Sequence, residues 1–115
     1  MEVGSDLMKG TVVPIVLALL RERPMYGYEI VKLVDARSGG KLRWKEGTLY
    51  PALHKLESDG LVRGDWRDAP GATDGGRQRK YYALTRSGRS ALARRLGEWK
   101  DFSTSINAVL KGALS

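Results

Sequence analysis

The stretch from Glu46 to Val62, EGTLYPALHKLESDGLV, decides the fold, because it has the pattern of a short helix followed by a strand. Its apolar residues recur every three or four positions and so share one helical face: Leu49, Ala52, Leu53 and Leu56. Gly60 follows Asp59 where a helix often ends in a residue with positive φ, and Leu61-Val62 then begins an extended run. We therefore predict a helix held by its leucines, with a polar face turned outward.

The polar face of this helix carries Thr48, Tyr50, Pro51, His54, Lys55 and Ser58. Hydroxyl, imidazole and ammonium groups suit the groove of a DNA duplex, since they can meet base edges and phosphates. The same pattern fits a plain surface helix, and this stretch taken alone favours that plainer interpretation.

Pro51 limits where the helix can begin, because a proline nitrogen has no hydrogen to donate. With Thr48 as the N-cap, Pro51 would lie in the first turn, where no donor is missed. A start nearer Glu46 would lose one backbone hydrogen bond.

The composition sets outer limits on fold and function. A chain of 115 residues makes one domain with a modest core, which association with another chain would help to stabilise. Lys and Arg number 20 against 13 Asp and Glu, and this net charge of +7 favours a polyanionic partner. The absence of cysteine excludes disulfides and thiolate metal sites and predicts a cytoplasmic location, while a single histidine argues against zinc. We expect no cofactor and no metal.

Two further helices are expected before this stretch. The apolar run from Val12 to Leu20 is too short to cross a bilayer, and the acidic Glu2 and Asp6 before it do not fit a signal peptide. Its apolar spacing predicts a helix buried on nearly all sides: Val13, Val16, Leu17 and Leu20. Pro14 either sits early in that helix or kinks it.

The segment MYGYEIVKLVDARSGG, residues 25–40, predicts the second helix, with Gly39-Gly40 as its stop. Its core-facing positions are Ile30, Leu33 and Val34. Gly27 between two tyrosines indicates a close backbone approach at the helix start, and Leu42-Arg43-Trp44 forms an extended link to the next helix. Three helices joined by tight turns are the skeleton of a helix-turn-helix unit, whose last helix enters the major groove.

Two strands, Leu61 to Trp66 and Gln78 to Leu84, are predicted next, joined by the loop RDAPGATDGGR. This loop is long for a hairpin. The return limb carries three cations beside the groove helix, which form a footprint for phosphate: Arg77, Arg79 and Lys80. As a merely solvated edge they would have no function. The predicted fold class is mainly α with a small β-hairpin, a winged helix-turn-helix DNA-binding domain over residues 1–85.

A long helix, with Thr85 as its N-cap, is predicted from about Arg86 towards Leu110. Its apolar positions form a coiled-coil-like seam: Leu92, Leu96, Trp99, Phe102, Ile106 and Val109. The seam exceeds what so small a domain can cover alone, so we expect residues 86–115 to be a dimerisation helix. The predicted dimer interface consists of Leu92, Leu96, Trp99, Ile106 and Val109.

With these pieces in place, the chain resembles the PadR family of bacterial transcriptional regulators. The resemblance is carried by YGYEI at Tyr26 to Ile30, EGTLYPALHKLESDGL at Glu46 to Leu61, and GGRQRKYYALTRSG at Gly75 to Gly88, with one tryptophan in the last helix. It implies a homodimeric winged-helix repressor of the small branch with one C-terminal helix, bound to a palindromic operator in double-stranded DNA. Residues of the family's recognition helix are matched by Thr48, Tyr50, Pro51 and Lys55, and those of its wing by Arg79 and Lys80. His54 stands where the family varies.

Trp99 allows two interpretations. An indole near a two-fold axis can stack on flat aromatic molecules and attract cations, and the resemblance implies planar hydrophobic ligands between paired tryptophans at this position. An effector there would contact Trp99 and Phe102. Alternatively, Trp99 fills the dimer core, as an aromatic at a seam position often does.

Two other classes of function fit the sequence less well. An enzyme is not expected, because the sequence has no Gly-x-Ser-x-Gly elbow, phosphate loop or metal-spaced ligand cluster. A winged helix used only for protein contacts is the alternative, and the cations at Lys55, Arg77, Arg79 and Lys80 argue against it. No membrane partner is expected.

Overall fold

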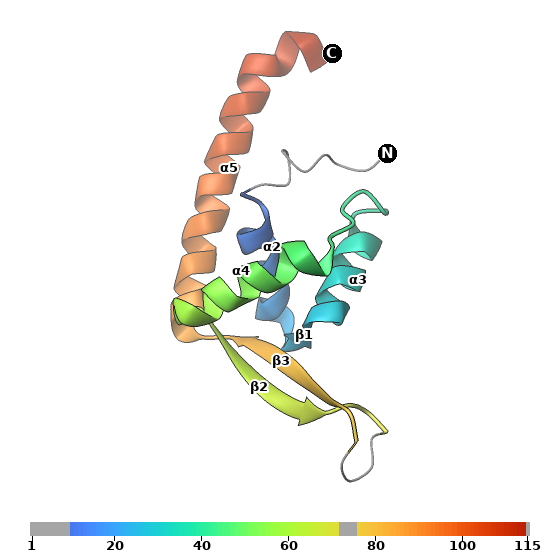
Figure 1. Cartoon of the computed structure of the whole chain (residues 1–115). Coiled ribbons are helices and arrows are strands. Elements are labelled where there is room, and N and C mark those ends of the chain that lie inside the picture. The colour runs from blue at the N-terminus through green and yellow to red at the C-terminus, as the bar shows by residue number, and fades with distance from the viewer. Residues whose placement is uncertain (1–9, 72–75, 115) are drawn as a thin grey trace.

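The computed structural model describes residues 10–71 and 76–114. Its elements run along the chain as α2 Val12–Glu22, β1 Met25–Tyr26, α3 Gly27–Arg37, α4 Glu46–Ser58, β2 Val62–Asp68, β3 Gln78–Leu84 and α5 Arg86–Leu114 (Figure 1). Three short helices, an antiparallel hairpin and a long terminal helix make up a winged helix, so the predicted fold class is confirmed. We call β2, β3 and the connection between them the wing.

The core lies where α2, α3 and α4 meet the base of the sheet. α2 is buried on most sides, as its apolar spacing predicted, and Pro14 lies in its first turn, where a missing N–H leaves no bond unmade. The buried apolar cluster comprises Val16, Leu17, Leu19, Leu20, Met25, Ile30, Val34, Trp44, Leu49, Leu53, Leu56, Val62, Tyr82, Ala91 and Leu92. The three leucines of α4 are thus buried in the core, and the opposite face of the helix is exposed to solvent.

The start of α4 differs from the prediction that made Thr48 its N-cap. The helix begins at Glu46, with Lys45 as the N-cap, and the amides of Thr48 and Leu49 both donate to the Lys45 carbonyl, at 2.9 and 3.2 Å. Pro51 therefore lies inside the helix, where it cannot donate to the carbonyl of Gly47. Both residues are exposed, so water can satisfy that carbonyl.

Glycines end α3 and α4 as predicted. Gly39, Gly40 and Gly60 have φ of 66°, 82° and 75°, which favours glycine over other residues. After α4, the Leu61 amide donates to the carbonyl of Leu56 at 2.9 Å, which closes the helix and turns the chain directly into β2. This short connection places the wing beside α4.

The sheet has three strands in the order β1-β3-β2, although only a hairpin was predicted. The strand missed is β1, two residues that pair with β3 through Met25–Tyr82 and Tyr26–Tyr81. A two-residue strand has no periodicity to reveal it, and its partner lies far along the chain. β2 continues to Asp68, and the Ala69 amide donates to the Arg77 carbonyl at 2.9 Å. The loop between the two strands is therefore shorter than predicted. Residues 72–75 of that loop, and the acidic residues 1–9, lie outside the described residues.

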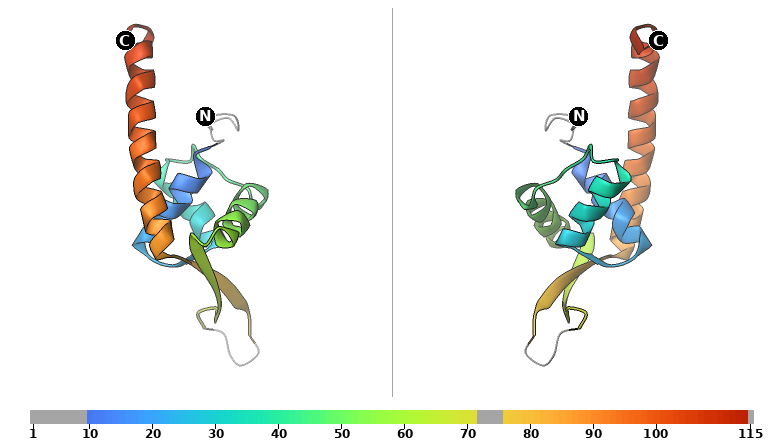
Figure 2. Two further views of the ribbon diagram at one scale, coloured as in Figure 1. Left: turned by 90° about the vertical axis from the view of Figure 1, so that its left-hand side faces the viewer. Right: turned by 90° about the vertical axis from the view of Figure 1, so that its right-hand side faces the viewer.

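α5 begins in the core and ends away from it. Thr85 is its N-cap, as predicted, because its hydroxyl accepts a hydrogen bond from the Gly88 amide at 3.0 Å. Ala91 and Leu92 pack into the core, whereas the 29-residue helix, about 43 Å long, continues beyond the other helices (Figures 1 and 2). The wing and the distal half of α5 point to opposite ends of the molecule.

Gly88 lets α5 approach the turn before β2. A Cβ at Gly88 would lie 2.1 Å from the carbonyl oxygen of Leu61, which is backbone and cannot swing aside. Helix propensity favours alanine over glycine by about 1 kcal/mol, but overpacking against backbone costs about 1–3 kcal/mol. We expect Gly88→Ala to lower the free energy of unfolding by up to about 2 kcal/mol, measured by thermal and urea denaturation.

The matched control for this prediction is Gly112→Ala in the same helix. Nothing lies within 4 Å of a Cβ at Gly112, so this change should leave stability equal or raise it slightly. A Gly88→Ala variant as stable as Gly112→Ala would contradict the close packing of α5 on Leu61.

Candidate nucleic-acid interface

The outer face of α4 presents the polar residues predicted for DNA. Thr48, Pro51, His54 and Lys55 are exposed, and the Lys55 side chain is 78% exposed. Its ammonium lies 3.4 Å from Asp59, one turn along the helix. A pair so exposed contributes at most about 1 kcal/mol, so Lys55 can leave Asp59 for a phosphate.

Tyr50 differs from its neighbours because it is half-buried. Its ring packs against the core, and its hydroxyl oxygen lies 2.6 Å from where a Cβ of Gly27 would be. The close approach expected at Gly27 is therefore real: α3 begins at that residue, and only a glycine admits the Tyr50 ring. The ring fixes α4 against α3 and holds the hydroxyl at the edge of the surface described next.

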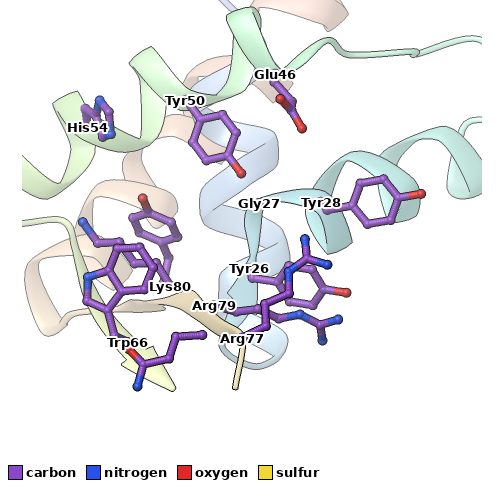
Figure 3. A pocket seen from close by; sticks show the side chains of 12 residues that line it. Tyr26, Gly27, Tyr28, Glu46, Tyr50, His54, Trp66, Arg77, Arg79 and Lys80 are labelled. Carbon is purple, nitrogen blue, oxygen red and sulfur yellow. The ribbon is translucent and has the colours of Figure 1, made fainter. Parts of the chain in front are cut away.

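A groove of about 660 Å³ separates the wing from α3 and α4 (Figure 3). Tyr50 points into it from α4, Trp66 and Lys80 lie on one side, and Tyr26, Tyr28 and Arg79 lie on the other. Its lining residues are Tyr26, Gly27, Tyr28, Glu46, Tyr50, His54, Trp66, Arg77, Gln78, Arg79, Lys80 and Tyr82. Aromatic rings, hydroxyls and cations around one concave surface can stack on sugars or bases and pair with phosphates.

The three wing cations predicted to share one edge are in fact divided. Successive residues of a strand face opposite sides, so Arg79 and Lys80 point apart. The Arg79 guanidinium lies 4.3 Å from the centre of the Tyr26 ring, while the Lys80 ammonium lies 2.9 Å from a carboxylate oxygen of Glu57 on α4. Arg77 is exposed at the start of the wing's return limb.

Charges on the α4 side of the wing are set by the Glu57–Lys80 contact. The hydrogen bond from Lys80 lowers the pKa of the Glu57 carboxyl, and the same bond raises the pKa of the Lys80 ammonium. Burial raises the pKa of Tyr82. At neutral pH, Glu57 and Lys80 are therefore both charged and Tyr82 is neutral.

Two exposed residues of the wing escaped the sequence prediction. Trp66, directly opposite Lys80 in the β2–β3 register, is 65% exposed and lines the groove. Arg67 lies opposite Arg79 and stacks on Tyr81, with 5.2 Å from the guanidinium carbon to the ring centre. Alternation along β2 could not have revealed the exposure of Trp66, because it places Trp66 on the same face as the buried Val62.

The family of the chain follows from comparison with known proteins. Residues 16–94, more than half of the chain, match the model of the transcriptional regulator PadR-like family. The chain belongs to this family.

Two solved structures and one further relative agree with the assignment. A transcriptional regulator from Clostridium thermocellum is 31% identical, with a TM-score of 0.81 over 92% of this chain and 96% of that one. A PadR family transcriptional regulator from Eggerthella lenta is 32% identical, with a TM-score of 0.77 over 91% and 86%. The transcriptional regulator Rv3488 of Mycobacterium tuberculosis is 46% identical over 50 residues, 44% of this chain and 42% of its own length.

As a PadR-like protein, the chain is a transcriptional regulator with a DNA-binding winged helix and not an enzyme. In residues 10–71 and 76–114, no three His, Cys, Asp or Glu side chains are placed to hold a metal ion. No helix in the same residues is long and apolar enough to span a membrane.

The seam of this PadR-like chain is divided by its own fold. Leu92, predicted at the dimer interface, is only 2% exposed, because it packs in the core, and it therefore has no surface to offer a partner. The apolar side chains beyond it are exposed: Leu96, Trp99, Phe102, Ile106, Val109, Leu110 and Leu114. The Trp99 and Phe102 rings lie 6.1 Å apart with their planes tilted by 35°.

Proposed function

We propose that this PadR-like protein is a homodimeric repressor that binds a palindromic operator and is released by a planar aromatic or hydrophobic effector. Residues 1–85 would bind DNA and residues 86–115 would join the two subunits. The DNA contacts would come from Thr48, Tyr50, Pro51, His54 and Lys55 on α4 and from Arg77 and Arg79 on the wing. We add Trp66 and Arg67 to these DNA-contacting residues because both are exposed on the wing.

The observation that carries the proposal is that α4 and the wing border one concave surface. The leucines of α4 are buried, so its exposed polar face can enter a major groove without loss of core. The wing adds Arg77 and Arg79 at the rim of the same groove. One duplex can therefore meet polar base-reading groups and phosphate-binding cations together.

The distal half of α5 supports the dimer. Seven large apolar side chains, from Leu96 to Leu114, are exposed in the single chain. A continuous apolar surface of this kind marks an interaction site, and a two-fold axis lets identical stripes cover each other. Two α4 helices held by such an axis would enter major grooves about 34 Å apart, or a multiple of that distance.

The effector site would lie between the two copies of Trp99. Trp99 is 49% exposed beside the exposed Phe102, so two such pairs across an axis could sandwich a flat molecule. A molecule bound there would change the spacing of the two wings and so alter DNA affinity.

The DNA contacts can be tested through the salt dependence of binding. Lys55→Ala and Arg79→Ala should each weaken binding to operator and random duplexes alike, because each removes a phosphate contact. The slope of log K against log salt should fall by about 0.9 for each lost contact, measured by fluorescence anisotropy over a salt series. Fragments of the upstream region of its own gene are the first operator to try. Tyr50→Phe keeps the ring against Gly27 and should weaken the operator more than the random duplex.

Lys100→Ala is the control for these variants. It removes one exposed cation from α5 and none from α4 or the wing, so it should leave the slope unchanged. Binding that ignores salt, or unchanged slopes for Lys55→Ala and Arg79→Ala, would contradict the proposal and favour a winged helix used for protein contacts.

A further inference from the structure

One carboxylate of α4 is held by both strands of the wing. Glu57 accepts a hydrogen bond from the Lys80 ammonium of β3 at 2.9 Å, through one oxygen. Its other oxygen accepts the Gly64 amide of β2 at 3.2 Å. Within residues 10–71 and 76–114, no other α4 side chain forms a hydrogen bond to the wing. The contact therefore ties the recognition helix to the hairpin on both strands at once.

Gly64 is the residue that permits this contact. A Cβ at Gly64 would lie 2.3 Å from Cε of Lys80 and 2.9 Å from a carboxylate oxygen of Glu57. A glycine inside a strand weakens the strand, and it often marks a close approach by another group. Here the approaching group is the Lys80 side chain, which crosses β2 to reach α4 and lies 5.3 Å from the centre of the Tyr82 ring.

The Lys80 ammonium is paired with the Glu57 carboxylate. The Lys80 and Glu57 side chains are 26% and 33% exposed, compared with 78% for Lys55 on the outer face of α4. Reaching a phosphate would require Lys80 to leave a partly shielded carboxylate and would leave Glu57 unpaired beside a polyanion. The Arg79 guanidinium instead rests on the Tyr26 ring, and within the described part of the chain it has no carboxylate partner to give up.

We propose that Glu57 and Lys80 are a positioning pair that fixes the wing against α4, and that Lys80 does not bind phosphate. The proposal rests on the proposed function, in which α4 and the wing grip one duplex. It replaces the role in DNA contact that the sequence predicted for Lys80. The pair would join α4 and the wing into one rigid unit, so that the distance between them is already fixed in the protein without DNA.

The direction in which Glu57→Gln changes DNA affinity distinguishes a positioning role of the pair from a direct phosphate contact by Lys80. Glu57→Gln removes a negative charge near the DNA, so electrostatics alone would strengthen binding and steepen its salt dependence, the more so if Lys80 were freed for a phosphate. If the pair positions the wing, binding should instead weaken about tenfold, and the salt slope should fall although no cation has been removed. The probe is a random-sequence duplex, followed by anisotropy through a salt series.

Glu46→Gln is the matched control. Glu46 lines the same groove and is exposed, and among the described contacts it has no hydrogen bond or ion pair to the wing. Losing its charge should strengthen binding or leave it unchanged. Lys80→Met should weaken binding as Glu57→Gln does, and the double variant should lose no more than either single one, because both changes break the same contact. If Glu57→Gln binds as tightly as the parent or more tightly, the positioning role is overturned.

A readout without DNA keeps this inference separate from the proposed function. The Gly64 amide is held by Glu57, so its hydrogen exchange, measured by NMR, should speed up at least tenfold in Glu57→Gln and stay unchanged in Glu46→Gln. Failure of the parent protein to bind any duplex would refute the proposed function, and Gly64 exchange would still decide whether the pair holds the wing. Equal Gly64 exchange in the parent and Glu57→Gln would refute the pair.

Discussion

Ile106→Asp should convert the proposed dimer into a folded monomer. Ile106 lies on the exposed apolar stripe of α5 and is outside the buried core, so a carboxylate there leaves the winged helix intact. In a dimer, the same carboxylate would be buried without a partner, at about 2 kcal/mol or more for each subunit. The two copies together would weaken association by about 4 kcal/mol, or roughly a thousandfold.

Size-exclusion chromatography with light scattering would measure this change, and circular dichroism would check that the helices remain. Thr104→Asp is the control, because it adds the same charge on the opposite face of the same helix turn. It should remain dimeric. A well-folded dimer of Ile106→Asp would refute an interface along this stripe, and monomers from both variants would point to a general effect of charge on α5.

Trp99→Ala should abolish most of the binding of planar aromatic dyes, while the six other exposed apolar side chains of α5 keep the proposed dimer together. Stacking on an indole contributes about 0.5–1.5 kcal/mol, and two symmetry-related rings would act on one bound molecule. We therefore expect binding to weaken by at least about tenfold, which corresponds to 1.4 kcal/mol. The anisotropy of the dye itself reports binding, so the other two tryptophans need not be changed.

The comparison variant is Trp66→Ala. Trp66 is more exposed than Trp99 but lies on the wing, so its loss should leave dye binding unchanged if the site is at the dimer interface. Both variants must be dimers at the concentration used. Equal dye affinity in the parent and Trp99→Ala would mean that Trp99 only packs between the subunits and that the effector site lies elsewhere.

Much of the fold could be predicted from the sequence, because its strongest signals are local. The leucines of α4, the apolar face of α2, the glycines after α3 and α4 and the Thr85 cap all depend on residues a few positions apart. Helical periodicity and helix-end signals act over that range, so these features can be predicted from the sequence. The start of α4 was misplaced because Thr48 and Pro51 both favoured a later start, whereas the structure accepts one unmade hydrogen bond inside the helix.

The sequence by itself determined that this protein has a helix with a polar outer face, a basic hairpin beside it and a long helix with an apolar stripe. Only the tertiary structure decided what each residue on those elements faces. Strand alternation and the carboxylate of Glu57 separate Lys80 from Arg79, although the two are neighbours in the chain. Packing against α2 takes Leu92 out of the stripe and leaves Leu96 on it. The physical reason is the same in both cases: a side chain's partner is set by elements that meet across the fold, and the spacing within one element carries no information about them.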